Sequence, residues 1–128
     1  MKDKYVLDSC LWIEIERGNP KVLSVVQPLI DKNEVCLVDV IVAEVLRGTK
    51  TRKDYLKLKE AFSHFSQLST SWGAVAELAF EACRKGFQPP LIDLYIAQCV
   101  LENDKTLLTQ DKHFPQIAKI RAFAVQMI

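Results

Sequence analysis

Four acidic residues are the strongest candidates for chemistry, because each stands beside or within an apolar segment: Asp8, Glu44, Asp93 and Asp111. A carboxylate in apolar surroundings is destabilising unless it is paired or bound to a metal ion. If the four converge, they need a counter-charge, and a hard divalent cation such as Mg²⁺ or Mn²⁺ prefers oxygen ligands. Such ions activate water and stabilise charge on phosphoryl groups. The residues therefore predict metal-dependent phosphate chemistry.

The elements that would position these acids alternate along the chain. Continuously apolar runs predict short buried strands over 5–7, 35–38, 67–70, 106–109 and 121–125. Helical spacing of apolar residues and capping signals predict helices over 11–17, 20–30, 40–47, 51–65, 71–86, 90–100 and 113–117. This alternation is typical of an α/β fold with a parallel central sheet and helices on both faces, in three α/β/α layers.

Parallel sheets carry their sites at the carboxyl ends of the strands, near the topological switch point. Asp8 and Asp111 each follow an expected strand, and Asp93 begins an expected helix. Glu44 shares a helix face with Val40, and that helix starts at the same edge of the sheet. We therefore expect the four carboxylates to meet at one rim.

Each acid also has a structural explanation that the sequence leaves open. Asp8 and Asp111 suit helix N-caps or turns. Glu44 suits an ion pair with Arg47, which follows three residues later on the same helix. Asp93 suits the first turn of a helix, where the helix dipole favours an acid.

Composition narrows the class of protein. The 128 residues predict a single domain over 1–128, and 49% hydrophobic with 26% charged residues argues against disorder. No apolar run reaches the ~18 residues of a membrane span. The run after the charged residues 1–4 is too short for a signal peptide, so we expect a cytoplasmic protein. The cysteines show no zinc-ligand spacing, and we expect buried thiols at Cys10, Cys36, Cys83 and Cys99.

The net charge is only +1, but basic residues gather between positions 47 and 59, where Asp54 is the one acid in a run of six cations. This segment is either a solvated helix face or a patch that attracts phosphate. The candidates for contacts with phosphate are Arg47, Lys50, Arg52 and Lys53. For the aromatic residue Trp12, a core position is the expected one.

Four segments carry the acids in a characteristic order: Val6–Ile13, Glu44–Gly48, Pro90–Ala97 and Leu108–Phe114. Together they resemble the motifs of PIN-domain ribonucleases, specifically the VapC-type toxins of bacterial toxin–antitoxin pairs. The resemblance implies a PIN-like fold and an endoribonuclease that depends on Mg²⁺ or Mn²⁺. It implies that the four acids are both the metal-binding and the catalytic residues.

The resemblance extends to neighbouring positions and to partners. Ser9 and Thr109 match hydroxyl positions that support the acids. Cys10 replaces a frequent serine, and His113 stands where many members carry a second acid, so Asp111 is the one acid of its motif. The family also implies a homodimer and a small VapB-type antitoxin whose C-terminal segment covers the acidic site. Apolar faces over 22–30 and 55–65 favour such association.

Other classes fit the sequence less well. A phosphoacceptor receiver domain expects paired acids after its first strand and a lysine after a later one, and an aspartyl phosphatase expects Asp-x-Asp. In this chain Asp8 lacks the second acid that each of these two patterns requires. A catalytically weak, RNA-binding PIN-like domain stays an alternative, although the presence of all four acids argues against it.

Overall fold

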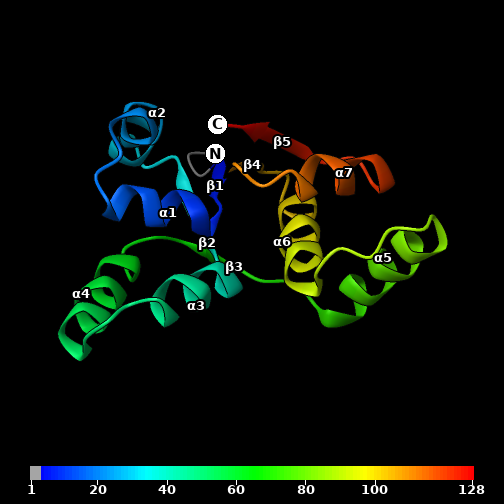
Figure 1. Cartoon of the computed structure of the whole chain (residues 1–128), viewed down its shortest axis with the longest axis horizontal. Coiled ribbons are helices and arrows are strands. Elements are labelled where there is room, and N and C mark those ends of the chain that lie inside the picture. Colours follow the sequence, from blue (N-terminus) through cyan, green and yellow to red (C-terminus); the bar gives the residue numbers. More distant parts are fainter. Residues whose placement is uncertain (1–3) are drawn as a thin grey trace.

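The computed structural model describes residues 4–128, which form a parallel sheet between two layers of helices (Figure 1). The strands are β1 (Tyr5–Leu7), β2 (Val35–Val38), β3 (Gln67–Leu68), β4 (Thr106–Thr109) and β5 (Ala124–Met127). The helices are α1 (Ser9–Glu16), α2 (Pro20–Asp31), α3 (Asp39–Arg47), α4 (Arg52–Phe62), α5 (Trp72–Arg84), α6 (Leu91–Glu102) and α7 (His113–Ile120). Helices α1–α4 lie on one side of the strands and α5–α7 on the other. The expected three-layer α/β fold is confirmed.

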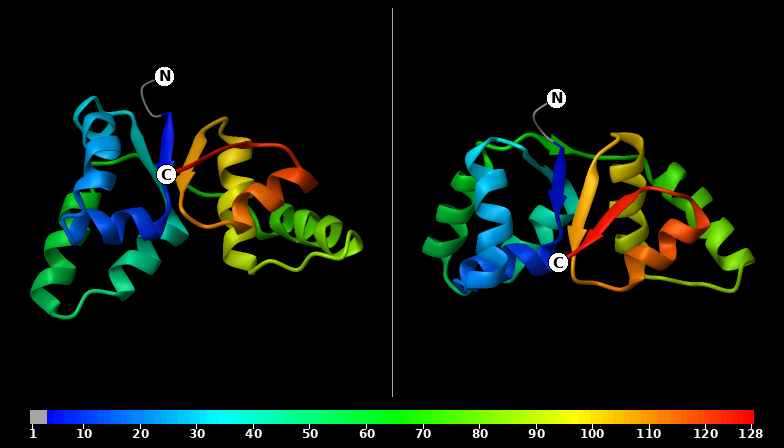
Figure 2. Two further views of the ribbon diagram at one scale, coloured as in Figure 1. Left: turned by 45° about the horizontal axis from the view of Figure 1, so that its top comes forward. Right: turned by 90° about the horizontal axis from the view of Figure 1, so that it is seen from above.

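The strand order places the switch point between β1 and β4. The sheet runs β3-β2-β1-β4-β5, and every neighbouring pair is parallel. Figure 2 shows β1, β4 and β5 pointing the same way, and Leu7 pairs with Leu108. The chain moves outward from β1 to β3 and then returns beside β1, so the carboxyl ends of β1 and β4 face a crevice. A receiver domain has the order 2-1-3-4-5, so this topology excludes that alternative.

The interior helix α6 fixes one side of this crevice. Its residues 94–100 are all buried, and it packs against α5, α7 and β4. A helix that is apolar on every side belongs in the interior. Its first turn, which carries Asp93, therefore has little freedom to move relative to the sheet.

The expected helix starts are confirmed where a side chain caps the helix. Asn19, Thr51 and Ser71 accept hydrogen bonds from backbone N–H groups of the first turns of α2, α4 and α5. The start expected at residue 11 was wrong by two residues, because Asp8 caps a helix that begins at Ser9.

Other boundaries differ for identifiable reasons. Helix α4 ends at Phe62 rather than at Phe65, because the chain turns there and places the Phe65 ring 5.7 Å from the Trp12 ring, edge to face. The last strand begins at Ala124 rather than at Arg121, whose guanidinium instead donates to Glu81 and Gln98. Trp12 is buried against both phenylalanines, as expected for a core residue.

The predicted burial of the four cysteines is confirmed for two of them. Cys36 and Cys99 are buried, Cys10 is only partly buried, and Cys83 is exposed on α5 because Ala82, its neighbour, faces the core. Val22, Val26 and Phe62 are buried, so the faces expected to drive association mainly form the core. No helix within residues 4–128 is long and apolar enough to cross a membrane. Residues 1–3, part of the segment considered for a signal peptide, lie outside the described range.

Candidate active site

The structure brings all four acids to one cavity of about 270 Å³ at the switch point. Asp8 follows β1, Glu44 projects from α3, Asp93 lies in the first turn of α6, and Asp111 follows β4. Helix α3 packs against both α1 and α6, which carries Glu44 to the rim. The complete lining is Asp8, Ser9, Cys10, Glu44, Asp93, Gln110 and Asp111.

Asp8 is the most buried of the four acids and is 5% exposed. Its Oδ1 accepts a hydrogen bond from the Ser9 N–H at 2.8 Å, and its Oδ2 accepts one from the Thr109 hydroxyl at 2.7 Å. Burial raises the pKa of Asp8, while the hydrogen bonds from Thr109 and Ser9 oppose this shift and the nearby Asp111 adds to it. Asp8 is therefore the N-cap of α1, which is the structural role that the sequence left open for it, and it also lines the acidic cavity.

The buried Thr109 hydroxyl joins two of the acids. It donates to Asp8 Oδ2 and accepts a hydrogen bond from the Asp111 N–H at 3.0 Å. The ends of β1 and β4 are therefore coupled through one oxygen atom. Ser9, the other hydroxyl that the sequence indicated, lines the cavity and opposes the upward shift in the pKa of Glu44.

Glu44 has electrostatic surroundings that favour its neutral form. Burial raises its pKa most, and the charges of Asp8 and Asp93 raise it further, whereas Ser9 and Arg47 oppose the shift. Within residues 4–128, no ion pair closer than 4.0 Å joins Glu44 to Arg47. The structural ion pair considered from the sequence therefore does not account for this acid.

Asp93 and Asp111 are linked by His113. The His113 Nδ1 atom lies 3.0 Å from Asp93 Oδ2 and 3.5 Å from Asp111 Oδ1. The His113 N–H also donates to Asp111 Oδ1 at 2.9 Å, so Asp111 orders the start of α7. Burial raises the pKa of Asp93, the hydrogen bond to His113 opposes this, and Asp111 and Asp8 raise it again.

Cys10, at a position where the sequence resemblance implies a serine, keeps a donor beside Asp8. Its Sγ lies 3.7 Å from Asp8 Oδ2. Burial and the adjacent Asp8 raise the pKa of the thiol, so it stays protonated and can donate. Gln110 also lines the cavity and was not among the predicted site residues, although its place between Thr109 and Asp111 was a sufficient signal.

The donor set suits a divalent cation. Three carboxyl groups have raised pKa values, and a neighbouring carboxylate contributes to each shift. A cation would relieve this repulsion, and carboxylate oxygens are the ligands that Mg²⁺ and Mn²⁺ prefer. Donor atoms of Asp93, Asp111 and His113 all lie within 4.8 Å of one another.

The basic candidates lie away from the lining of the acidic cavity. Arg47, Lys50, Arg52 and Lys53 are all exposed, at the end of α3 and the start of α4. The Arg52 guanidinium lies over the Tyr55 ring, 5.1 Å from its centroid. These positions agree with a solvated helix surface.

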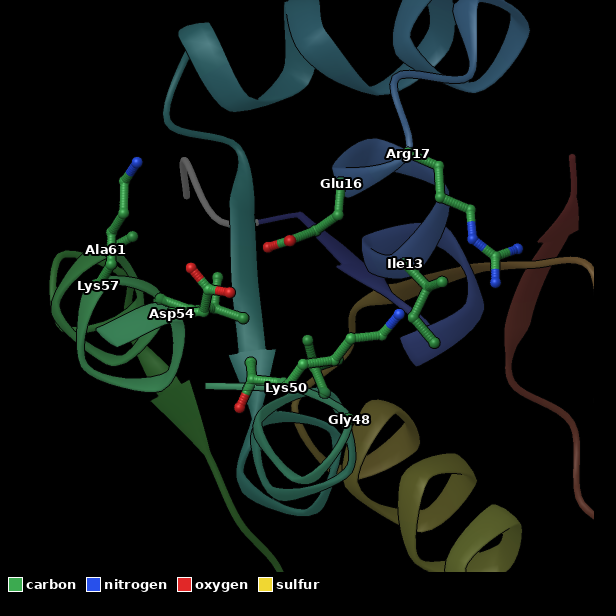
Figure 3. Close-up of a pocket in the computed structure, with 11 residues that line it drawn as sticks. Ile13, Glu16, Arg17, Gly48, Lys50, Asp54, Lys57 and Ala61 are labelled. Carbon is green, nitrogen blue, oxygen red and sulfur yellow. The ribbon is translucent and has the colours of Figure 1, made fainter. Parts of the chain in front are cut away.

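A second cavity of about 750 Å³ lies between α1, α3 and α4 (Figure 3). Ile13, Val45 and Leu58 give it an apolar lining. Charged residues of both signs complete it, namely Glu16, Arg17, Lys50, Asp54 and Lys57. It is larger than the acidic cavity, but its two carboxylates are matched by basic groups, so it lacks the concentrated negative charge that would recruit a metal ion.

The sequence and the fold of this chain are similar to those of known proteins. A family model described as the PIN domain matches residues 5–120. A VapBC2 structure from Rickettsia felis, bound to a DNA fragment from its promoter, matches with 21% identity and a TM-score of 0.78 over 97% of this chain and 98% of that chain. A DNA-bound VapBC from Salmonella typhimurium matches with 17% identity and a TM-score of 0.76 over 97% of each chain.

A third structure, a toxin–antitoxin complex from Klebsiella pneumoniae, matches with 19% identity and a TM-score of 0.72 over 95% of each chain. No curated protein sequence matches this chain. At these identities the three solved structures establish a shared fold.

Replacing Thr109 by valine should destabilise the protein. The change keeps the side-chain shape but leaves Asp8 Oδ2 and the Asp111 N–H without this partner. The free energy of unfolding should fall by about 1–3 kcal/mol, as measured by urea denaturation. Thr106→Val, the same change at the start of the same strand, is the control and should lose less. Equal stability of the two variants would show that the Thr109 hydroxyl does not hold the site together.

The raised pKa of Glu44 predicts how stability depends on pH in EDTA. A glutamate ordinarily titrates near pH 4.3, so in the window above that value the folded state holds more protons than the unfolded state. The contribution of Glu44 to the free energy of unfolding is therefore present at low pH and is lost as pH rises through the folded pKa.

Thermal melts of the wild type and Glu44→Gln, from pH 4.5 to 7.5, test this expectation. The variant should gain stability relative to the wild type as pH rises, because it carries no charge there. Glu77→Gln, on an exposed part of α5, is the control and should track the wild type. A constant difference between Glu44→Gln and the wild type would contradict the expectation.

Proposed function

This chain belongs to the PIN domain family, and we propose that it is a metal-dependent endoribonuclease, the toxin of a VapBC-type toxin–antitoxin pair. The observation that carries the proposal is the meeting of Asp8, Glu44, Asp93 and Asp111 in one cavity at the switch point. Structural carboxylates would not need to share a cavity in which they raise one another's pKa. The activity would reside in a single domain over residues 1–128.

The four acids would hold Mg²⁺ or Mn²⁺. When bound, the ion would lower the pKa of a water molecule and stabilise charge that develops on the phosphate. Thr109 would keep Asp8 oriented, since a buried hydroxyl bonded on both sides leaves the carboxylate few alternative positions. Glu44 or Asp93 would orient the attacking water and take its proton, because burial moves both pKa values up towards neutral pH.

RNA would be held mainly through its backbone. Arg47, Lys50, Arg52 and Lys53 are exposed and can reach phosphates without reading sequence. Among these four residues, Arg47 is the one whose positive charge lowers the pKa of Glu44, so it is close enough to influence the proposed site. Cytoplasmic RNA would be the substrate, with base preference set by unpaired nucleotides near the cavity.

Two partners belong to the proposal: a small VapB-type antitoxin that covers the acidic site, and a second copy of this chain. The most exposed large apolar residues suit the second copy. Phe80 is 64% exposed, Leu91 57% and Trp72 53%. Leu91 begins α6, which packs against α5, the helix that carries Trp72 and Phe80, so we take these three exposed side chains as the candidate apolar patch.

Purified protein freed of any antitoxin should cut an RNA pool in the presence of Mg²⁺ or Mn²⁺ and should stop when EDTA is added. Asp8→Asn should stay folded and lose activity by at least about 100-fold, because it removes a charge that the reaction needs. Asp104→Asn, at an exposed turn with φ of 55°, is the control and should keep full activity.

The same variants separate the alternatives. EDTA-resistant cleavage, or full activity of Asp8→Asn, would refute the metal-dependent mechanism. RNA binding without cleavage at any tested metal concentration would favour the catalytically weak RNA-binding alternative. Expression of the wild type alone should stop bacterial growth and Asp8→Asn should not; normal growth with soluble, active enzyme would refute the toxin role.

Light scattering at micromolar concentration should show a dimer. Leu91→Lys should shift it towards monomer, because a charge in the apolar patch opposes burial. Leu56→Lys is the matched control, since Leu56 is 50% exposed but lies on α4. A wild-type monomer, or a dimer that Leu91→Lys leaves intact, would remove this patch as the surface for a second copy.

A further inference from the structure

We propose that the His113 imidazole is a metal ligand through Nδ1, together with Asp93 and Asp111, and that it makes the site prefer a first-row transition ion such as Mn²⁺ to Mg²⁺. The inference rests on the proposed metal site and goes beyond it, because it assigns a nitrogen ligand and an order of ion preference. His113 Nδ1 lies within 3.5 Å of a carboxylate oxygen of both Asp93 and Asp111, so it can add a nitrogen donor to their oxygen donors.

The geometry places the three donors around a common point. His113 Nδ1 lies 3.0 Å from Asp93 Oδ2 and 3.5 Å from Asp111 Oδ1, and donor atoms of all three residues lie within 4.8 Å of one another. Ligands on opposite sides of an octahedral ion with bonds of about 2.1 Å lie roughly 4.2 Å apart. With the imidazole proton held on Nε2, so that Nδ1 presents its lone pair, small side-chain movements would therefore let one ion contact all three.

The backbone holds the imidazole in this place. The Asp111 N–H donates to the Thr109 hydroxyl, and the His113 N–H donates to Asp111 Oδ1 at 2.9 Å. The next residue, Phe114, is completely buried and anchors the start of α7. The position of His113 beside Asp93 and Asp111 is thus determined by the same hydrogen bonds that order Asp8 and Asp111.

The chemistry of the donors sets the preference. Mg²⁺ is hard, binds oxygen and loses its water ligands reluctantly. Imidazole nitrogen suits transition ions, whose affinity for a given site rises from Mn²⁺ to Co²⁺ and Ni²⁺. A neutral imidazole ligand also carries no negative charge, so it adds less than a carboxylate would to the attraction of Mg²⁺.

Pulsed electron paramagnetic resonance on the Mn²⁺-loaded full chain, prepared without a polyhistidine tag, tests the ligand directly. The wild type should show the ¹⁴N coupling of a coordinated imidazole, and His113→Gln and His113→Asp should lose it. His64→Gln should keep the coupling, because His64 lies on the turn after α4 and contacts Glu60 instead. A wild type that binds one Mn²⁺ without imidazole coupling would overturn the proposal.

Titration calorimetry with Mn²⁺ and with Mg²⁺ tests the preference without relying on activity. His113→Gln should weaken Mn²⁺ binding by at least about tenfold, the lower limit for losing a residue that supports a metal site. The ratio of Mg²⁺ to Mn²⁺ dissociation constants should be larger in the wild type than in His113→Asp. An equal or smaller ratio would contradict the inference.

The two experiments distinguish failure of this inference from failure of the proposed function. Metal binding that Asp8→Asn weakens and His113→Gln leaves unchanged would overturn the role of His113 alone. A wild type with imidazole coupling and the expected ion preference, but with no cleavage of RNA, would support the ligand and refute the nuclease. A wild type that binds neither ion would overturn both.

Discussion

The hydrogen bond from the Thr109 hydroxyl to Asp8 Oδ2, 2.7 Å long and buried, is the interaction on which the site depends. It joins the ends of two adjacent parallel strands at the point where the chain reverses its direction across the sheet. The same hydroxyl accepts the Asp111 N–H, and Asp111 in turn accepts the His113 N–H. The Thr109 hydroxyl oxygen therefore positions Asp8 and Asp111 directly, and His113 through Asp111.

This arrangement explains how the fold tolerates an acidic cavity. Asp8 caps α1 through one carboxylate oxygen and accepts from Thr109 through the other, so its structural bonds offset part of the penalty of burial. Asp93 has His113 as its partner, whereas Glu44 has weaker compensation from Ser9 and Arg47. The structural and functional interpretations of these acids are thus compatible, since a residue that holds a helix end can also face a bound ion.

Much of the fold and of the cavity could be predicted because the relevant signals are local. Continuous apolar runs marked β1, β2 and β4, and Asp8 and Asp111 followed two of them directly. The burial of Glu44 followed from helical spacing alone. The start of β5 was not predictable, because Arg121 binds Glu81 and Gln98, which are distant in sequence. The position of Trp72 at the start of α5 likewise depends on a distant residue, because its half-exposed ring lies against Tyr95 of α6.

The bond between Asp8 and Thr109 spans 101 positions of the chain, which has a consequence for biosynthesis. Contacts this distant in sequence form late, because the intervening loop must close first. During translation the first three strands and their helices can fold while β4 is not yet made, but the carboxylates cannot yet be brought together. A site divided in this way stays incomplete until most of the chain has been synthesised.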